Sequence, residues 1–466
     1  MPISPLLSLS LLPLLAAEPS ASPSPSPSPP AGAAWSYDAI PSADLSELAV
    51  EASFASASRL EVDRATAPFV QEVQQLDGEK ATPLPGGGPW QVKGCARGCR
   101  VRYKFRLTRA AARLSDPDEV ASFGPTIVFS PGALLLRPVG DAPAGARYRL
   151  RVRSRQGLRF ATGLPSTGDL DTHEGPADGI GMAPYSALGP LSASTRSACS
   201  TELQIAIAQG RRAVSDADLV EWVNTGARQV CEYLGKLPVP GTLVLLVPAN
   251  GDLGKTLGGG GATTLLGIPA HATLEELRKS WVLVHELVHT ALPALPERHH
   301  WMEEGLATYL EPIVRARAGA LPAEKVWADM LDGLPKGQLR AGEDGLDDAP
   351  RWGPTYWGGA LFWLKLDLEI RRRTRGERSL REALRAVGKQ EGTIAVHWPL
   401  ERLLAALDKG AGFAAAEPLY RAMGPRRQRP DLEAMWKALG VSGDVNGAEL
   451  DDGAPEAELR RAITAP

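Results

Sequence analysis

The sequence predicts an α+β multidomain fold, with an N-terminal β-sandwich-like domain, a central domain with a mixed sheet and helices, and C-terminal helices. Two changes in pattern along the chain lead to this prediction. Before about residue 192, alternating segments such as Arg100–Leu107 and Tyr148–Val152 are separated by Gly and Pro at short intervals, which is typical of strands and turns. After Thr273 almost every segment has the apolar spacing and the end signals of helices. We therefore expect a β-rich domain over residues 37–192, a second domain over 193–375 and a helical region over 376–466.

The composition is ordinary for a soluble globular protein, with 44% hydrophobic and 23% charged residues and a formal net charge of −3. This near-neutral balance gives no reason to expect a nucleic acid as a partner. Arginines in the segment Arg147–Arg159 alternate with apolar residues, which favours a solvated strand face over a site for a polyanion. No stretch after the N-terminal region is apolar enough to cross a membrane, so we expect no transmembrane segment.

The first residues have the pattern of an export signal. Leu6–Ala17 is an apolar run that is too short to span a bilayer comfortably, and it ends in small residues. We therefore expect residues 1–17 to be a cleaved signal peptide and the protein to be exported to the periplasm, the cell surface or the medium. Residues 18–36 are rich in Ser and Pro, which predicts an extended linker.

The four cysteines agree with export. Cys95 and Cys99 lie in a glycine-bearing turn where a short-loop disulfide is feasible, and zinc binding there would need two further ligands that no second close pair supplies. Cys199 and Cys231 form either a second disulfide or two buried thiols, and the sequence leaves both interpretations open.

Several elements of the central domain have clear signals. Ser215 is placed to cap a helix that continues to about Leu234, and the apolar run Leu243–Val247 predicts a buried strand. The glycine run Gly258–Gly261 predicts a turn that leads into an edge strand over Ala262–Ile268. An edge strand can align a peptide by main-chain pairing, so we expect this strand to line a substrate cleft.

A metal-binding motif lies in the helix that follows. Thr273 and Glu276 form a capping box that starts this helix, and we expect it to run to about Leu292. Inside it, His285 and His289 are four residues apart and therefore project from one face, where both imidazoles can reach one cation. Metal-free burial of the two histidines is the alternative interpretation.

Glu286 follows the first histidine directly, and its side chain is offset from it by about 100° around the helix. It is therefore placed to act on a water at the metal instead of binding the metal itself. Two histidines leave a catalytic metal site short of one ligand.

The segment Trp301–Tyr309 supplies the third ligand, because a chain reversal before it would bring a second helix alongside the first. Glu304 is the candidate, with 14 residues between it and His289. Glu303 points about 100° away from it and is expected to be solvated or to support the ligand. His299 and His300 are expected to be ordinary polar residues of the turn.

These two motifs resemble those of the gluzincin metallopeptidases. The sequence HELVH, residues 285–289, corresponds to their first motif, and EEGLATY, residues 303–309, corresponds to the Glu-Gly helix that carries their third zinc ligand. On that pattern Glu304, directly before Gly305, is the ligand. The resemblance also implies a thermolysin-like zinc catalytic domain.

A second stretch is similar to the glycyl aminopeptidase family, which is related to aminopeptidase N. The chain shares a Tyr-x-x-Gly-Ala segment at Tyr356–Ala360 that opens a long helix, and a Ser-Leu-acidic turn near Ser379. The resemblance implies that the Tyr356 phenol stabilises the oxyanion, and an aromatic core cluster with Trp352 and Trp357 is the alternative. The PDZ-like module of that family is not expected in the residues after 390.

The resemblance has one departure with a functional meaning. Those relatives carry a Gly-Gly-x-Glu motif whose Glu binds the free amine of the substrate, whereas this chain reads GGGGATT at residues 258–264, without a carboxylate. The sequence therefore leaves aminopeptidase and endopeptidase activity both open.

Together these residues predict zinc-dependent hydrolysis of a peptide or protein substrate, with one Zn²⁺ per chain held by His285, His289 and Glu304. Glu286 is the expected general base and Tyr356 the expected oxyanion donor. Two alternatives remain open, namely an inactive zinc protein that binds a peptide or a partner, and a hydrolase of a non-peptide amide. The sequence predicts no oligomeric state.

Overall fold

The computed structural model describes residues 33–154, 157–169, 171–250 and 253–466. The expected signal peptide and most of the expected linker lie outside these residues. Strand β1 (Ala33–Pro41) begins inside the segment 18–36 that the sequence analysis assigned to the linker. Across the described part of the chain, no helix is long and apolar enough to cross a membrane.

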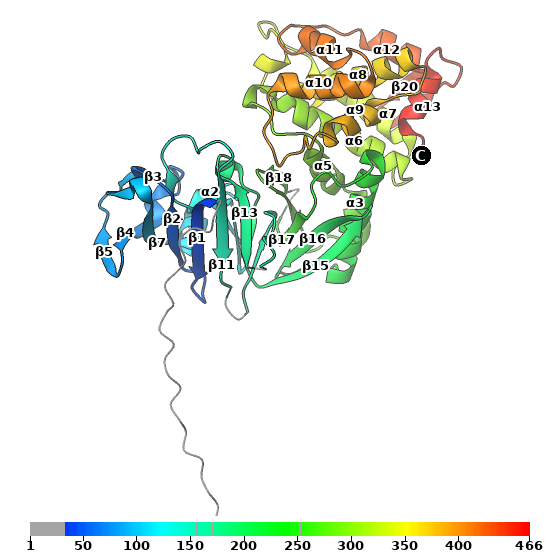
Figure 1. The fold of residues 1–466 in the computed structure, drawn as a ribbon. Coiled ribbons are helices and arrows are strands. Elements are labelled where there is room, and N and C mark those ends of the chain that lie inside the picture. Colours follow the sequence, from blue (N-terminus) through cyan, green and yellow to red (C-terminus); the bar gives the residue numbers. More distant parts are fainter. Residues whose placement is uncertain (1–32, 155–156, 170, 251–252) are drawn as a thin grey trace, which may run out of the picture.

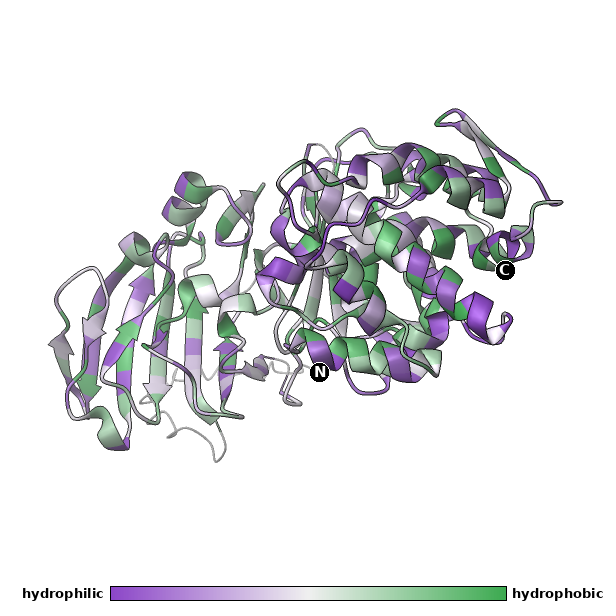
Figure 2. Ribbon diagram, turned by 90° about the horizontal axis from the view of Figure 1, so that it is seen from above, coloured by the Kyte–Doolittle hydropathy of each residue, from purple (hydrophilic) through white to green (hydrophobic). Residues whose placement is uncertain are grey.

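The N-terminal part contains a seven-stranded sheet in the order β13-β11-β1-β2-β7-β4-β5 (Figure 1). Besides β1, its strands are β2 (Leu48–Phe54), β4 (Val70–Asp77), β5 (Lys80–Pro83), β7 (Cys99–Phe105), β11 (Arg147–Val152) and β13 (Thr172–Pro176). Residues along β1 alternate strictly between buried and half-buried, and the same alternation of hydropathy is visible across the sheet (Figure 2). This period of two is what one buried face requires.

A smaller sheet closes the buried face, with the strand order β10-β3-β6. Its strands are β3 (Arg59–Glu61), β6 (Trp90–Gln91) and β10 (Arg137–Pro138). Leu60 and Trp90 from this sheet pack in one core with Phe54 and Phe105 from the large sheet. The expected sandwich-like domain is therefore present. The short helices α1 (Leu107–Leu114) and α2 (Pro131–Leu134) complete it.

A third sheet joins this domain to the next one, in the order β12-β14-β9-β8. Its strands are β8 (Val120–Phe123), β9 (Thr126–Phe129), β12 (Arg159–Thr162) and β14 (Ser186–Gly189). Val128 and Ala187 from this sheet share an apolar cluster with Leu245 and Leu265 of the central sheet. The cluster covers one face of the central sheet.

The central sheet has five strands in the order β15-β16-β17-β19-β18. They are β15 (Leu191–Ala198), β16 (Thr201–Ala208), β17 (Thr242–Pro248), β18 (Gly254–Gly258) and β19 (Ala262–Ile268). β16, β17 and β19 are parallel, and β15 and β18 are antiparallel to their neighbours, so the sheet is mixed as predicted.

The edge strand differs from the expectation. The prediction that Ala262–Ile268 is an edge strand is wrong, because β19 pairs with β17 on one side and with β18 on the other. The glycine turn reverses the chain, and the strand after the turn is the one that pairs inward. β18, before the turn, is therefore the outer strand.

Helices cover the other face of the central sheet (Figure 1). The first of these are α3 (Asp216–Leu234), α4 (Leu274–Lys279), α5 (Val282–Val288) and α6 (His300–Arg317). The single helix expected from Thr273 to Leu292 is broken into α4 and α5. Ser280 causes the break, because its backbone is extended and its hydroxyl accepts the Val282 N–H at 3.3 Å, which competes with helical hydrogen bonding.

The remaining helices stack above α5 and α6 (Figure 1). They are α7 (Ala323–Gly333), α8 (Gly359–Thr374), α9 (Leu380–Gly388), α10 (Leu400–Ala411), α11 (Ala416–Met423), α12 (Leu432–Leu439) and α13 (Ala457–Thr464). A hairpin of β20 (Val441–Asp444) and β21 (Gly447–Leu450) lies among them, within the region expected to be helical. The predicted α+β multidomain class is confirmed.

Two disulfides are present, and they resolve the pairing that the sequence left open. Cys95 is bonded to Cys99 within the N-terminal domain. Cys199 is bonded to Cys231 and joins the turn between β15 and β16 to helix α3. The second bridge fixes the β15–β16 hairpin, at the opposite side of the central sheet from β18, to the helical layer.

Candidate active site

Three side chains converge at the junction of sheet and helices: His285 from α5, His289 from the 3₁₀ turn His289–Ala291 that follows it, and Glu304 from α6. The Nε2 atom of His285 lies 3.5 Å from Oε2 of Glu304, and Nε2 of His289 lies 3.6 Å from the same oxygen. One ligand atom from each residue lies within 4.8 Å of the others. The i, i+4 spacing brings the two imidazoles together, and the packing of α6 against α5 brings in the carboxylate.

These three residues fit a metal ion by two independent observations. Ligands about 2.0–2.1 Å from a tetrahedral zinc ion lie roughly 3.3 Å from one another, close to the two distances between imidazole nitrogens and the Glu304 carboxylate. In addition, Oε2 of Glu304 is buried without a hydrogen-bond partner. A buried carboxylate oxygen without a partner is costly, and a cation between the three atoms would satisfy it.

Glu286 lies beside this group and is buried, with 6% of its surface exposed. Thr256 on β18 donates its hydroxyl to Oε2 of Glu286 at 2.9 Å. Burial raises the pKa of the Glu286 carboxyl, while His289, Thr256 and Lys255 oppose that rise. A raised pKa suits a group that must both accept and return a proton.

Gly254, at the start of β18, gives Glu286 the space that it occupies. A Cβ atom at position 254 would lie 2.9 Å from Oε1 of Glu286 and 2.4 Å from the Val282 side chain. The strand can therefore approach α5 this closely only with glycine here. The face of β18 that bears Gly254 and Thr256 therefore lies against the carboxylate.

Tyr356 faces the same group from a π-helical turn, Gly353–Gly358, that opens α8. Its ring is stacked parallel to His285 with ring centroids 6.4 Å apart. Burial and the nearby carboxylates of Glu304 and Glu286 raise the pKa of the Tyr356 phenol, so it stays protonated and can donate a hydrogen bond. Trp352 stacks on the other side of Tyr356 but is 60% exposed, which does not match the alternative of an aromatic core.

Glu303 does not point at the histidine pair. Its carboxylate accepts the Leu295 N–H at 3.1 Å and contacts Nδ1 of His300 at 3.0 Å. Glu303 therefore connects the loop before α6 to the start of that helix by hydrogen bonds. The choice of Glu304 over Glu303 as the candidate ligand agrees with this geometry.

His300 and His299 have more specific surroundings than the sequence analysis expected. Nε2 of His300 lies 3.4 Å from Oε1 of Glu304, the oxygen that does not face the two histidines. Its contacts with Glu303 and Glu304 raise the pKa of His300 to about 10. The i, i+4 spacing to Glu304 was the available sequence signal. His299 is buried against Asp347, which no sequence pattern indicated.

The glycine turn between β18 and β19 is packed on all sides by backbone. A Cβ at Gly261 would lie 1.9 Å from the backbone oxygen of Gly163, and one at Gly258 would lie 2.1 Å from that of Ile394. Gly163 belongs to the N-terminal domain, so this domain closes the turn from outside. A side chain at Gly258 or Gly261 would therefore overlap backbone atoms of neighbouring segments.

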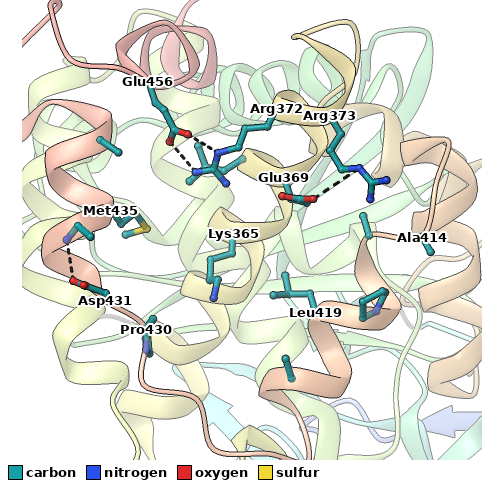
Figure 3. Close-up of a pocket in the computed structure, with 16 residues that line it drawn as sticks. Lys365, Glu369, Arg372, Arg373, Ala414, Leu419, Pro430, Asp431, Met435 and Glu456 are labelled. Atoms are coloured by element: carbon teal, nitrogen blue, oxygen red, sulfur yellow. Dashed lines mark hydrogen bonds and ion pairs between the residues drawn. The ribbon is translucent and has the colours of Figure 1, made fainter.

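A cavity of about 600 Å³ lies away from this site, between α8, α11 and α12 (Figure 3). Its charged groups are largely paired, because Arg372 forms two hydrogen bonds with Glu456 and Arg373 contacts Glu369 at 4.0 Å. None of the candidate catalytic or metal-binding residues lines it. It is a groove among the C-terminal helices.

Comparison with known proteins shows which solved structures share this fold. No model of a known protein family matches the chain, and no curated protein matches it. Among solved structures, an aminopeptidase N family protein from Idiomarina loihiensis matches with a TM-score of 0.63 and 15% identity, covering 87% of this chain and 78% of that one.

A mutant M1 zinc metallopeptidase from Deinococcus radiodurans, bound to a Tyr-Ser-Ala substrate, matches with a TM-score of 0.54 and 18% identity. The match covers 86% of this chain and 95% of that one. The chain has the fold of the M1 zinc metallopeptidases. At these identities the comparison establishes the architecture, and the chemistry has to be argued from the residues of the site.

Proposed function

We propose that this chain is a gluzincin-type metallopeptidase that binds one Zn²⁺ per chain through His285, His289 and Glu304. The observation that carries the proposal is the buried oxygen of Glu304, which lies without a hydrogen-bond partner about equally far from the two histidine nitrogens. Two nitrogens and one carboxylate oxygen, with a fourth position left open, form the ligand set of catalytic zinc sites. The shared M1 fold supports it.

Bound zinc would polarise the substrate carbonyl and lower the pKa of a water molecule to about 7. Glu286 accepts the proton of the attacking water and returns it to the leaving amine. Tyr356 donates its phenol hydrogen to the oxygen that becomes negative in the transition state. Strand β18, the outer strand of the central sheet, pairs with the backbone of the peptide.

A peptide or protein is the proposed substrate. One solved structure with this fold is described as bound to a Tyr-Ser-Ala substrate, which supports the same class of ligand here. The similarity of Tyr356–Ala360 to the glycyl aminopeptidase family supports that subfamily. The apolar run Leu6–Ala17 supports export of the enzyme, and the two disulfides are of the kind found in oxidising compartments.

We also propose that the enzyme does not need a free N-terminus on its substrate. The packing around Gly258–Gly261 leaves no room for a carboxylate that would bind an α-amine there. An endopeptidase, or an exopeptidase that selects its substrate by other contacts, agrees with this closed turn. Cleavage of matched peptides with free and acetylated N-termini tests it, and a strong preference for free amines would contradict it.

The main experiment compares Glu286→Gln with Glu297→Gln, an exposed glutamate in the turn before α6. The zinc-loaded wild type is expected to cleave a mixed peptide pool, with one metal ion per chain by elemental analysis. Glu286→Gln should keep the metal and lose cleavage, whereas Glu297→Gln should keep both. Unchanged cleavage in Glu286→Gln rejects the proposed base, and a wild type that binds peptides without cleaving them supports the non-catalytic alternative. Cleavage of non-peptide amides, with no cleavage of peptides, supports the alternative of a hydrolase of a non-peptide amide.

A further inference from the structure

A continuous row of aromatic rings runs through the candidate active site. Trp281, at the start of α5, contacts His285 edge-to-face with ring centroids 4.9 Å apart. His285 stacks on Tyr356 at 6.4 Å, and Tyr356 stacks on Trp352 at 6.1 Å. The two tryptophans therefore lie at opposite ends of a row whose middle contains the metal-binding histidine and the oxyanion donor.

The ends of this row are open to solvent although its middle is not. Trp281 is 47% exposed and Trp352 is 60% exposed, while His285 is only 5% exposed. Burying a large apolar side chain stabilises a protein, so a tryptophan left this exposed gives up part of that contribution. A substrate that covers both rings would recover it.

Few large apolar side chains are exposed in the part of the chain that the structure describes. Within the described residues, five large hydrophobic residues are exposed: Met182, Trp281, Trp352, Val396 and Val445. Met182 and Val396 flank the glycine turn next to α5, since Gly259 packs on the Met182 backbone and Gly260 donates to the oxygen of Ala395, which precedes Val396. Two of the five, Trp281 and Trp352, contact rings of the candidate site itself, whereas Val445 lies in the β20–β21 turn. Exposed apolar residues that gather at one site mark a binding surface.

The backbone that carries each tryptophan is held by hydrogen bonds and close packing. Trp352 follows Arg351, whose guanidinium forms two hydrogen bonds of 2.6 and 2.7 Å with Glu343. The backbone behind Trp352 is closely packed, because a Cβ at Gly353 would lie 2.2 Å from the oxygen of Lys336. The carbonyl of Trp281 accepts the first helical hydrogen bond of α5, from the His285 N–H at 3.1 Å. Fixed aromatic surfaces bind with a small loss of conformational entropy.

From these observations we infer that Trp281 and Trp352 form two apolar subsites at opposite ends of the metal site, and that the preferred substrates are peptides with large apolar or aromatic side chains on both sides of the cleaved bond. This inference rests on the proposed peptidase function and names its substrate class. The rings contact substrate side chains and determine specificity, while the bond-breaking chemistry stays with Glu286 and Tyr356. Edge-to-face and stacked contacts with aromatic side chains of the substrate strengthen binding beyond the effect of the buried apolar area.

The test uses two internally quenched peptides that are identical except for Phe or Ala at both residues next to the cleaved bond. The wild type should have the higher kcat/KM for the Phe peptide. In the protein variants Trp281→Ala and Trp352→Ala, the ratio of kcat/KM for the Phe peptide to that for the Ala peptide should fall about tenfold, with the zinc content unchanged. The variants Trp281→Phe and Trp352→Phe should keep most of the wild-type ratio. Val445→Ala is the control and should keep the wild-type ratio. An unchanged ratio in both alanine variants that still cleave peptides overturns the inference.

A binding measurement separates this inference from the proposed reaction. In zinc-loaded Glu286→Gln, the same two peptides are titrated and their affinities measured by fluorescence anisotropy, without and with each tryptophan variant. Tighter binding of the Phe peptide that is lost in Trp281→Ala or Trp352→Ala supports the subsites. This holds even if the wild type proves unable to hydrolyse peptides, which would reject the proposed function alone. Equal affinity for both peptides in every variant rejects the subsites.

Discussion

The hydroxyl of Thr256 on β18 lies 2.9 Å from Oε2 of Glu286 and also 2.9 Å from the backbone oxygen of the same residue. The hydroxyl of Thr264 on β19 lies 3.0 Å from that of Thr256. If Thr264 donates to Thr256, the proton of Thr256 remains directed at Glu286. Two threonines on the central sheet thus hold the candidate general base at the sheet-facing side of α5.

We predict that Thr256→Val slows hydrolysis without weakening zinc binding. A hydrogen bond to a charged group contributes about 1.5–3 kcal/mol, so its loss should lower kcat about 10- to 100-fold while KM changes little. Steady-state kinetics on one peptide, together with metal analysis, checks this. Thr256→Ser keeps the hydroxyl and should recover most of the rate. Equal losses in the Val and Ser variants would mean that only packing at position 256 matters.

The sequence was most informative where the signal is local. The spacing of His285 and His289 determines which face of a helix they share, and Gly305 distinguished Glu304 from its neighbour Glu303. Gly305 is also required sterically, because a Cβ there would lie 2.4 Å from the backbone of Gly359 in α8. These relationships depend on a few neighbouring residues or on one close contact, so a short sequence motif can predict them.

Contacts between residues that are far apart in the chain could not be predicted from the sequence. Thr256 contacts Glu286 across 30 positions, and nothing in the pattern of β18 indicates it. The order of β18 and β19 depends on which strand pairs with β17, and this pairing is decided by tertiary packing. Asp347 lies in an irregular segment without periodicity, although it is a buried centre of the helical part. Such contacts arise from tertiary packing.

We predict that His300→Ala weakens zinc binding. His300 contacts Oε1 of Glu304 at 3.4 Å, and groups that orient a metal ligand typically affect metal affinity by 10- to 100-fold. Competition with a chromogenic chelator measures the change in the zinc dissociation constant. His271→Ala, at an exposed position before α4, is the control and should bind zinc as the wild type does. An affinity within twofold of the wild type would show that Glu304 needs no support from His300.

We predict that Asp347→Ala destabilises the helical part by about 3–5 kcal/mol. The buried carboxylate accepts hydrogen bonds from His299 at 2.8 Å, Trp301 at 2.8 Å and Tyr420 at 2.7 Å, so its removal leaves three donors without a partner. Chemical denaturation measures the free energy of unfolding. Asp348→Ala, an exposed neighbour, should change it by less than about 0.5 kcal/mol. Equal effects of the two substitutions would contradict the role of the network.

The same carboxylate predicts a pH dependence of stability. Burial raises the pKa of Asp347, but the hydrogen bonds from His299, Trp301 and Tyr420 outweigh it and leave the pKa lowered. A lowered pKa in the folded state means that the stabilisation is complete above the unfolded value of about 3.9 and is lost as the pH falls below it. The difference in unfolding free energy between wild type and Asp347→Ala should therefore shrink as the pH falls below about 4.

The last prediction concerns Gly261, where the N-terminal domain meets the turn beside the active site. The Ala262 N–H donates to the backbone oxygen of Gly163 at 3.3 Å, and a Cβ at position 261 would lie 1.9 Å from that oxygen. Backbone cannot yield as a flexible side chain does, so Gly261→Ala must separate the two domains locally. We expect a loss of about 1–3 kcal/mol of stability.

Gly181→Ala is the matched control, because no atom lies within 4 Å of a Cβ built there. Thermal unfolding should distinguish the two variants clearly. Gly261→Glu should be at least as destabilised as Gly261→Ala and should gain no preference for free N-termini, because its carboxylate has no space inside the turn. A stable Gly261→Glu variant with a new preference for free amines would show instead that the turn opens readily, and that a carboxylate is all that the site lacks for aminopeptidase selectivity.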